Sequence, residues 1–206
     1  MARRRAPQRS PLPREGKGAG EGVLRSADSW WFAHSLSCHQ IKLSMTKGER
    51  ISRLVAELTD DNFDLGEADV RNNPFYRAFF RCWNEQCYYE AHDVLEQLWL
   101  KTKSRDADFF RGLIQAAGAF FHLQKRFEHP SHVKHSRRLP PAVRLFQLAE
   151  RNLSKFGPQY YGLDVAALCE LLRAYAKEIV ASDYKTNPWS PDTAPKLKVG
   201  EVHPVK

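Results

Sequence analysis

The sequence predicts an all-α protein, a compact bundle of about five to six helices. Apolar residues recur at spacings of three and four from Thr46 onward, which is the period of a helix with one buried face. No stretch shows the sustained alternation that is expected of strands. The 206 residues are 42% hydrophobic and 27% charged, a composition that is ordinary for one globular domain with tails.

The first two helices lie on either side of a polar segment. A helix is expected over 47–58, with Thr46 as its N-cap. Its apolar face consists of Ile51, Leu54, Val55 and Leu58. The segment 60–74 interrupts the pattern, and a second helix begins near Pro74, because proline fits the first helical position. The residues that this helix directs inward are Phe75, Phe79, Cys82 and Trp83.

The third and fourth helices are joined by a short connection. The third is expected from about Tyr88 to Leu100, and the fourth continues to about Phe127. Either Asp106 or Asp108 can cap the start of the fourth helix. Its main apolar face consists of Phe109, Phe110, Leu113, Ala117, Phe120 and Phe121. This segment is the most apolar of the chain.

Two further helices complete the predicted bundle. Prolines at 140–141 introduce a fifth helix, and Gly157 followed by Pro158 stops it. A sixth helix begins at Asp164. The apolar faces of the two helices contain Leu145, Leu148, Ala149, Leu153, Leu168, Leu172, Tyr175 and Ile179. Beyond Asp183 the prolines and the scarcity of apolar residues predict an extended tail, with Trp189 as its point of packing.

Composition divides the chain into a disordered basic leader (1–44), the helical bundle (45–183) and the extended tail (184–206). The leader is rich in Gly and Pro, so burial cannot offset its ordering entropy. We prefer the interpretation that Met45 is the true start and that the preceding residues are an upstream extension. The alternative is a transit peptide for a plastid or another organelle, because the leader is rich in Arg and poor in acids.

Cysteine usage favours a reducing compartment, and the cytoplasm is the expected location unless the leader is a transit peptide. The four cysteines form no CxxC pair. Cys82 and Cys169 fall on apolar helical faces, where a thiol packs as a small hydrophobic group. The uncharged stretch near the middle of the chain, Gly112–Gln124, has 13 residues, fewer than the ~20 that span a membrane. We therefore expect no membrane span.

The net charge of +8 lies mostly in the leader, because residues 1–45 hold eight Lys or Arg and three acidic residues. A specific nucleic-acid site is not expected, since no aromatic residues form a stacking platform among the basic ones. The sequence also lacks a Gly-rich phosphate loop and a nucleophile elbow. It identifies no partner, and a homo-oligomer stays open.

Polar residues form stripes on the third and fourth helices. The stripe of the third helix contains Tyr89, His92, Glu96 and Trp99, and a second edge contains Glu90 and Asp93. The stripe of the fourth helix, opposite its apolar face, contains Arg111, Gln115, Gly118 and His122. Gly118 would let another backbone approach closely. If the two helices pair antiparallel, as their short connection suggests, the two stripes meet.

Two runs of sequence carry a family resemblance. They are YYEAHDVLEQLW at 88–99 and FRGLIQAA at 110–117. Together they resemble the signature of the family catalogued as domain of unknown function 309, roughly EAHExLExxW followed by GLIQ, over about Phe75 to Leu153. The resemblance implies a small all-α protein and no particular reaction. Asp93 stands where the family usually has Glu, and residues 129–138 replace a shorter turn.

His92 and Glu96 are the candidate acid–base pair, because they lie one helical turn apart and can share a proton or one divalent metal ion. Gln115 is the expected orienting partner. The further candidate binding residues are Glu90, Asp93, Trp99, Arg111 and His122. One hypothesis is therefore a small-molecule or metal pocket, with or without catalysis. The other is a non-catalytic interaction module in which the polar residues form an architectural hydrogen-bond network.

A loop after the fourth helix has histidines at a spacing of three, His129, His132 and His135. Tracts rich in histidine can bind metal. Pro130 disturbs the helical register, and basic residues follow up to Arg138. A solvated basic loop is therefore the preferred interpretation, and its role stays open.

Overall fold

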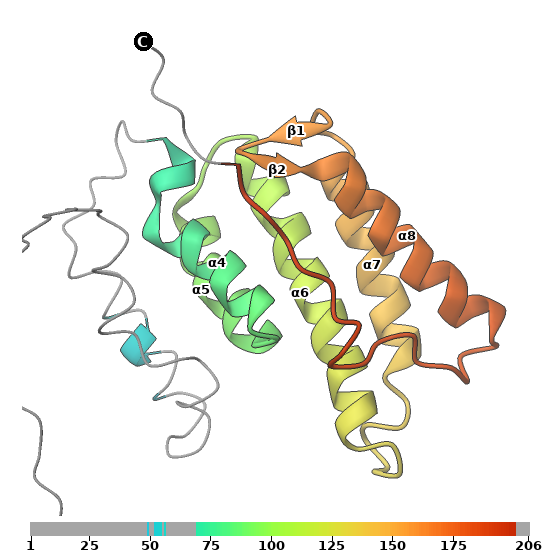
Figure 1. Ribbon diagram of the computed structural model, residues 1–206. Helices are drawn as coiled ribbons and strands as arrows, with labels where there is room; N and C mark the ends of the chain where they lie inside the picture. The colour runs from blue at the N-terminus through green and yellow to red at the C-terminus, as the bar shows by residue number, and fades with distance from the viewer. Residues whose placement is uncertain (1–48, 50–51, 55, 57–68, 201–206) are drawn as a thin grey trace, which may run out of the picture. The chain divides into compact units, whose positions relative to one another are not determined.

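The computed structural model describes residues 49, 52–54, 56 and 69–200. Over 69–200 the elements are η1 (Val70–Asn72), α4 (Pro74–Asn84), α5 (Tyr88–Lys101), α6 (Asp106–Glu128), α7 (Leu139–Leu153), β1 (Gln159–Tyr160), β2 (Leu163–Asp164) and α8 (Val165–Ala181). Each helix from α4 to α8 packs against the next, so that α6 has α5 on one side and α7 on the other (Figure 1). The prediction of an all-α bundle is confirmed. Among the described helices, none is both long and apolar enough to cross a membrane.

Of the five α-helices described over 69–200, two begin at a residue whose side chain caps them. Asn73 caps α4, accepting from the backbone N–H of Phe75 at 2.9 Å, and Pro74 occupies the first position. Asp164 caps α8 through its side chain. The predicted cap of α6 was wrong: the N-cap position belongs to Arg105, whose side chain makes no capping bond. Asp106 lies instead in the first turn, where the helix dipole favours a carboxylate.

Part of the predicted structure lies outside the described residues. Of the helix expected over 47–58, the structure describes Glu49, 52–54 and Ala56, which are all helical. The rest of that helix, the leader and residues 201–206 are not described. The expected disorder of the leader therefore stays a prediction.

The core is built around α6. Its fully buried side chains include Phe109, Leu113, Ala117 and Phe120. Phe120 lies at the centre of an aromatic group, with its ring centroid 4.9 Å from Trp83 and 5.5 Å from Tyr88. The three described cysteines, Cys82, Cys87 and Cys169, are all buried. This confirms the expectation that Cys82 and Cys169 are packing residues.

α6 and α7 are in tight contact at Gly112. A Cβ atom on this residue would lie 2.7 Å from Cγ of Leu153 and 3.3 Å from the carbonyl oxygen of Ala149. Real Cβ atoms do not come that close to their neighbours, so the contact requires glycine. The sequence suggested Gly118 for this role, yet a Cβ there would meet only Cδ1 of Leu145, at 3.4 Å.

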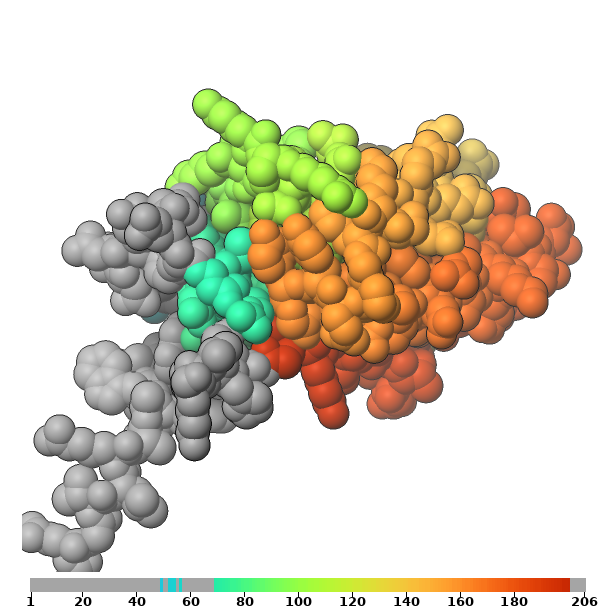
Figure 2. Space-filling view, turned by 90° about the horizontal axis from the view of Figure 1, so that it is seen from above, coloured from blue at the N-terminus to red at the C-terminus, as the bar shows by residue number. Residues whose placement is uncertain are grey.

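A short antiparallel hairpin of β1 and β2 precedes α8. Tyr161 and Gly162 form its turn with φ values of 46° and 76°. The hydroxyls of Tyr160 and Tyr161 donate to the carboxylate of Asp106, at 2.6 and 3.0 Å, and thereby fasten the hairpin to the start of α6. Strands of two residues are too short to show an alternating pattern, which is why the sequence did not predict them. Viewed from this end, the orange hairpin residues cover the middle of the described chain (Figure 2).

The tail beyond Asp183 is extended, as predicted, and residues up to 200 pack on the helices. The red segment in Figure 1 runs back from the end of α8 along α6 toward β2. Trp189 is 2% exposed, and its indole N–H donates to the hydroxyl of Tyr88 at 3.2 Å. Leu197 is also buried. The core therefore extends beyond the boundary at Asp183 that composition suggested.

We expect Trp189→Ala to destabilise the protein by about 3–5 kcal/mol, because the change leaves a cavity between α6 and the tail. Tyr184→Ala is the matched control, since this tail residue is 41% exposed. Urea unfolding followed by circular dichroism measures both free energies of unfolding. Equal stability of the two variants would show that the tail adds nothing to the core.

We expect Gly112→Ala to cost about 1–3 kcal/mol, because the added methyl group overpacks the contact with Leu153. Gly118→Ala should be neutral, or should stabilise the helix by up to about 1 kcal/mol, since alanine has the higher helix propensity. Thermal unfolding of the two variants measures the contrast. A loss at position 118 as large as that at position 112 would contradict this assignment of the close contact.

Candidate functional site

Three ionisable residues come together on the outer face of α5. They are His92, Asp93 and Glu96, and one ligand atom from each lies within 4.8 Å of the others. On a helix that turns about 100° per residue, Glu96 lies about 40° from His92 and about 60° from Asp93, so it projects between them. The buried residues of α5, among them Ala91, face the opposite way. We call these three residues the α5 group.

The geometry of the α5 group assigns the tautomer of His92. Its Nδ1 lies 2.8 Å from Oδ1 of Asp93. A carboxylate only accepts hydrogen bonds, so Nδ1 carries the proton of the neutral ring and Nε2 has a free lone pair. The side chains of His92 and Asp93 are 34% and 16% exposed. Nε2 can therefore take a proton or a metal ion at a site that solvent reaches.

Sequence reasoning missed Asp93 as the partner of His92. Asp93 was placed on a second edge with Glu90, since consecutive helical residues point about 100° apart and do not normally face each other. The signal that could have shown the pairing is Glu96, which lies between the two on the helix surface. His92, Glu96 and Asp93 therefore form one arc on the helix surface rather than two edges.

Aromatic rings flank the α5 group on both sides along the helix. The ring of Tyr89 stacks beside that of His92 at 6.4 Å with an interplanar angle of 10°. Tyr89 also contacts Phe121 of α6, at 5.4 Å. At the other end Trp99 lies under the guanidinium of Arg111, 5.4 Å from its ring centroid. These two contacts show that α5 and α6 run antiparallel, as the sequence predicted.

Gln115 belongs to the contact of α6 with α7. Its Oε1 accepts from the side-chain amide of Asn152, at 2.9 Å. Lys155 in turn donates to Oδ1 of Asn152 at 3.2 Å and to Asp108 at 2.7 Å. Arg111 pairs weakly with the same Asp108, at 3.6 Å. Gln115 therefore orients Asn152, and the expected role as partner of His92 has no hydrogen bond to support it.

Glu90 lies on the other flank of α5, about 160° around the helix from His92. It is 3% exposed. Lys101 projects from the same flank and lies over the ring of Phe75 of α4, 5.7 Å from its centroid. Glu90 is therefore part of the packed side of α5 and does not join the α5 group.

His122 lies near the end of α6 and contacts the start of α7. Arg138 donates from Nη1 to Nδ1 of His122, at 3.1 Å, and from Nε to Nδ1 of His135, at 2.7 Å. Burial, together with the charge of Arg138, lowers the pKa of His122 to about 4. His122 is thus a neutral acceptor that orients Arg138, and the structure places it in a contact separate from the α5 group.

The fold and the α5 group define a helical domain with a polar cluster on one outer helix face. A family model described as Domain of unknown function (DUF309) matches residues 76–131. This segment runs from α4 through α6 and contains both sequence runs that carried the resemblance. The match confirms the resemblance over these residues. No curated protein and no solved structure matches the chain.

We expect His122 to make stability depend on pH. The unfolded residue has a pKa of 6.5 and the folded one a pKa of about 4, so between these values only the unfolded chain binds the proton. The stabilisation is complete above pH 6.5 and is lost as the pH falls toward 4. Urea unfolding of the wild type and of His122→Gln over this pH range measures this stabilisation. The carboxylates titrate in both proteins, so their effect cancels in the difference between the two free energies of unfolding. Parallel curves would contradict the expectation.

Proposed function

We propose that the α5 group binds a divalent metal ion and that this ion serves a small-molecule site. The observation that carries the proposal is the approach of three ligand atoms, one each from His92, Asp93 and Glu96, to within 4.8 Å of one another. One imidazole and two carboxylates suit Zn²⁺, Mn²⁺ or Fe²⁺. Two carboxylates also neutralise the charge of such an ion.

The three residues of the α5 group have different roles in this proposal. Asp93 holds the ring of His92 in one tautomer and one orientation, through the 2.8 Å contact to Nδ1, as carboxylates do for metal-bound or catalytic imidazoles. Nε2 of His92, the second carboxylate oxygen of Asp93 and the carboxylate of Glu96 remain to ligate the ion or to move a proton. A bound ion with only three protein ligands keeps positions for water or substrate, and supplies Lewis-acid chemistry there.

The flanking side chains give this site its binding walls. Tyr89 and Trp99 are partly exposed and offer flat apolar surface on either side of the α5 group. Arg111 is 47% exposed above Trp99 and brings a positive charge to one end. A small molecule with an apolar part and an anionic group fits this combination.

The second candidate is a non-catalytic interaction module. The pairing of Gln115 with Asn152 favours it, because this polar contact lies between two packed helices and fixes their register. The exposure of His92 favours the first candidate, since a purely architectural residue has no need of solvent access. In the first candidate, any enzyme activity depends on the binding of the metal ion.

We place the protein in a reducing compartment, with the cytoplasm preferred and an organelle as the alternative. Cys82 and Cys169 are free thiols, which persist where disulfides do not form.

We expect the purified chain to bind Zn²⁺ or Mn²⁺ with one-to-one stoichiometry in calorimetry after chelator treatment. Glu96→Gln and His92→Asn should each weaken binding by about 10–100-fold, because the first replaces a carboxylate by an amide of the same size and the second removes the imidazole. Asp93→Asn should weaken it as well. Glu170→Gln is the matched control, since this exposed acid lies on α8 and should leave binding unchanged.

The opposite result separates the two candidates. In one outcome no ion binds, Glu96→Gln lowers the melting temperature, and the double variant with His92→Asn melts no lower. The two residues then act as one architectural unit. Neutral or raised melting temperatures in the metal-free variants support a working site, because strained polar groups are relieved by their removal.

A further inference from the structure

The turn between α6 and α7 concentrates positive charge. Residues 125–138, here called the basic turn, contain five Lys or Arg, three His and a single acid, Glu128. That acid is already paired with Lys125. After residue 45 the whole chain has 24 Lys or Arg and 21 acidic residues. The basic turn therefore has a larger excess of positive over negative charge than all residues after 45 together, with the turn included.

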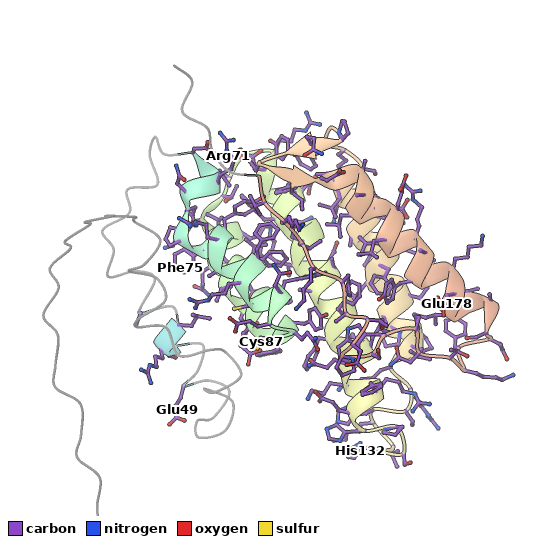
Figure 3. The ribbon with its side chains drawn as sticks, viewed as in Figure 1. Glu49, Arg71, Phe75, Cys87, His132 and Glu178 are labelled. Atoms are coloured by element: carbon purple, nitrogen blue, oxygen red, sulfur yellow. The ribbon has the colours of Figure 1, made fainter. Side chains whose placement is uncertain are left out.

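The backbone of the basic turn gathers its imidazoles. Hydrogen bonds from the N–H of His132 to the carbonyl of His129 and from the N–H of His135 to that of His132, at 3.2 and 2.9 Å, set a repeat of three residues. The ring centroids of His132 and His135 are 4.5 Å apart. His132 lies at the end of the described chain that is opposite the hairpin (Figure 3). The imidazoles thus add to the charge at one extremity when they are protonated.

The start of α7 strengthens this field. The first turn of α7 contains no acidic residue, and no side chain caps it. A helix N-terminus carries a partial positive charge that acids normally offset. Here Arg137 and Arg138 precede the helix instead. Neither the helix end nor the two arginines is neutralised by an acid of that turn.

The basic turn also exposes apolar surface at its tip. Val133 is 79% exposed and Phe127 is 48% exposed. Lys134 follows Val133 directly and is exposed. An exposed valine adds nothing to the binding of a nucleic-acid phosphate backbone, and the bases are usually bound by stacking on aromatic side chains. A lipid bilayer uses both features, cations at the headgroups and an apolar side chain in the interfacial zone.

We propose that the basic turn docks the protein on an anionic phospholipid surface, with Lys134 and Arg137 against the headgroups and Val133 in the interfacial zone. Arg138 is held between His122 and His135 and keeps the base of the turn in place. The contact leaves the α5 group free, so the proposal is independent of the metal site.

The test is sedimentation of the full chain with vesicles of phosphatidylcholine alone and of phosphatidylcholine mixed with phosphatidylserine. Binding is expected only to the anionic vesicles, and less at high salt. Lys134→Gln with Arg137→Gln should weaken it about 25-fold, at about fivefold per cation. The charge-matched control is Arg151→Gln with Lys198→Gln, two exposed cations outside the turn, and it should bind like the wild type. Val133→Ser should weaken binding about threefold or more at unchanged charge.

Several results would overturn the proposal. They are absence of binding to the anionic vesicles, equal losses in the turn variant and its control, and no effect of Val133→Ser. A gel shift with a single-stranded oligonucleotide adds the competing partner. If the turn variant loses oligonucleotide binding while vesicles never bind, the partner is a nucleic acid and the lipid surface is excluded. Equal melting temperatures of the variants show that folding is intact.

Discussion

The close contact of α6 with α7 at Gly112 determines how the other described helices are arranged. Leu153 fills the space that a side chain at 112 would need, and the carbonyl oxygen of Ala149 would lie 3.3 Å from a Cβ there, so α7 packs closely against the backbone of α6. α5 then covers the other side of α6, and the aromatic rings around Phe120 join the layers. The hairpin is held to the start of α6 by the bond from Tyr160 to Asp106, and the tail is held to α5 by the bond from Trp189 to Tyr88.

This arrangement decides which polar groups are available for chemistry. The inward side of α5 is packed, so His92, Asp93 and Glu96 project from a helix that cannot rotate. Side chains on a rigid helix keep their mutual geometry better than side chains on a loop. Gln115 and Asn152 instead satisfy each other between α6 and α7. Polar residues that look alike in the sequence thus have different surroundings: the α5 group is partly exposed, whereas Gln115 and Asn152 pair between two packed helices.

The α5 group and the basic turn are connected through a short series of ring contacts. Tyr89 touches both His92 and Phe121. The guanidinium of Arg138 lies 5.8 Å from the ring centroid of Phe121. An acidic group that suits a cation and a basic turn that suits anions therefore share one side of α6.

The sequence by itself determined the helices, their approximate ends and the presence of an ionisable stripe around His92, because helical period and capping are local properties of the chain. The tertiary structure decided which stripes meet. Gln115 finds Asn152 37 residues away, and Trp189 finds Tyr88 101 residues away. No periodic pattern encodes such pairs, since they depend on which faces of two distant segments are left to pack. The same holds for Gly112 rather than Gly118 as the glycine in tight contact with α7, because only the position of Leu153, 2.7 Å from a Cβ at 112, distinguishes the two.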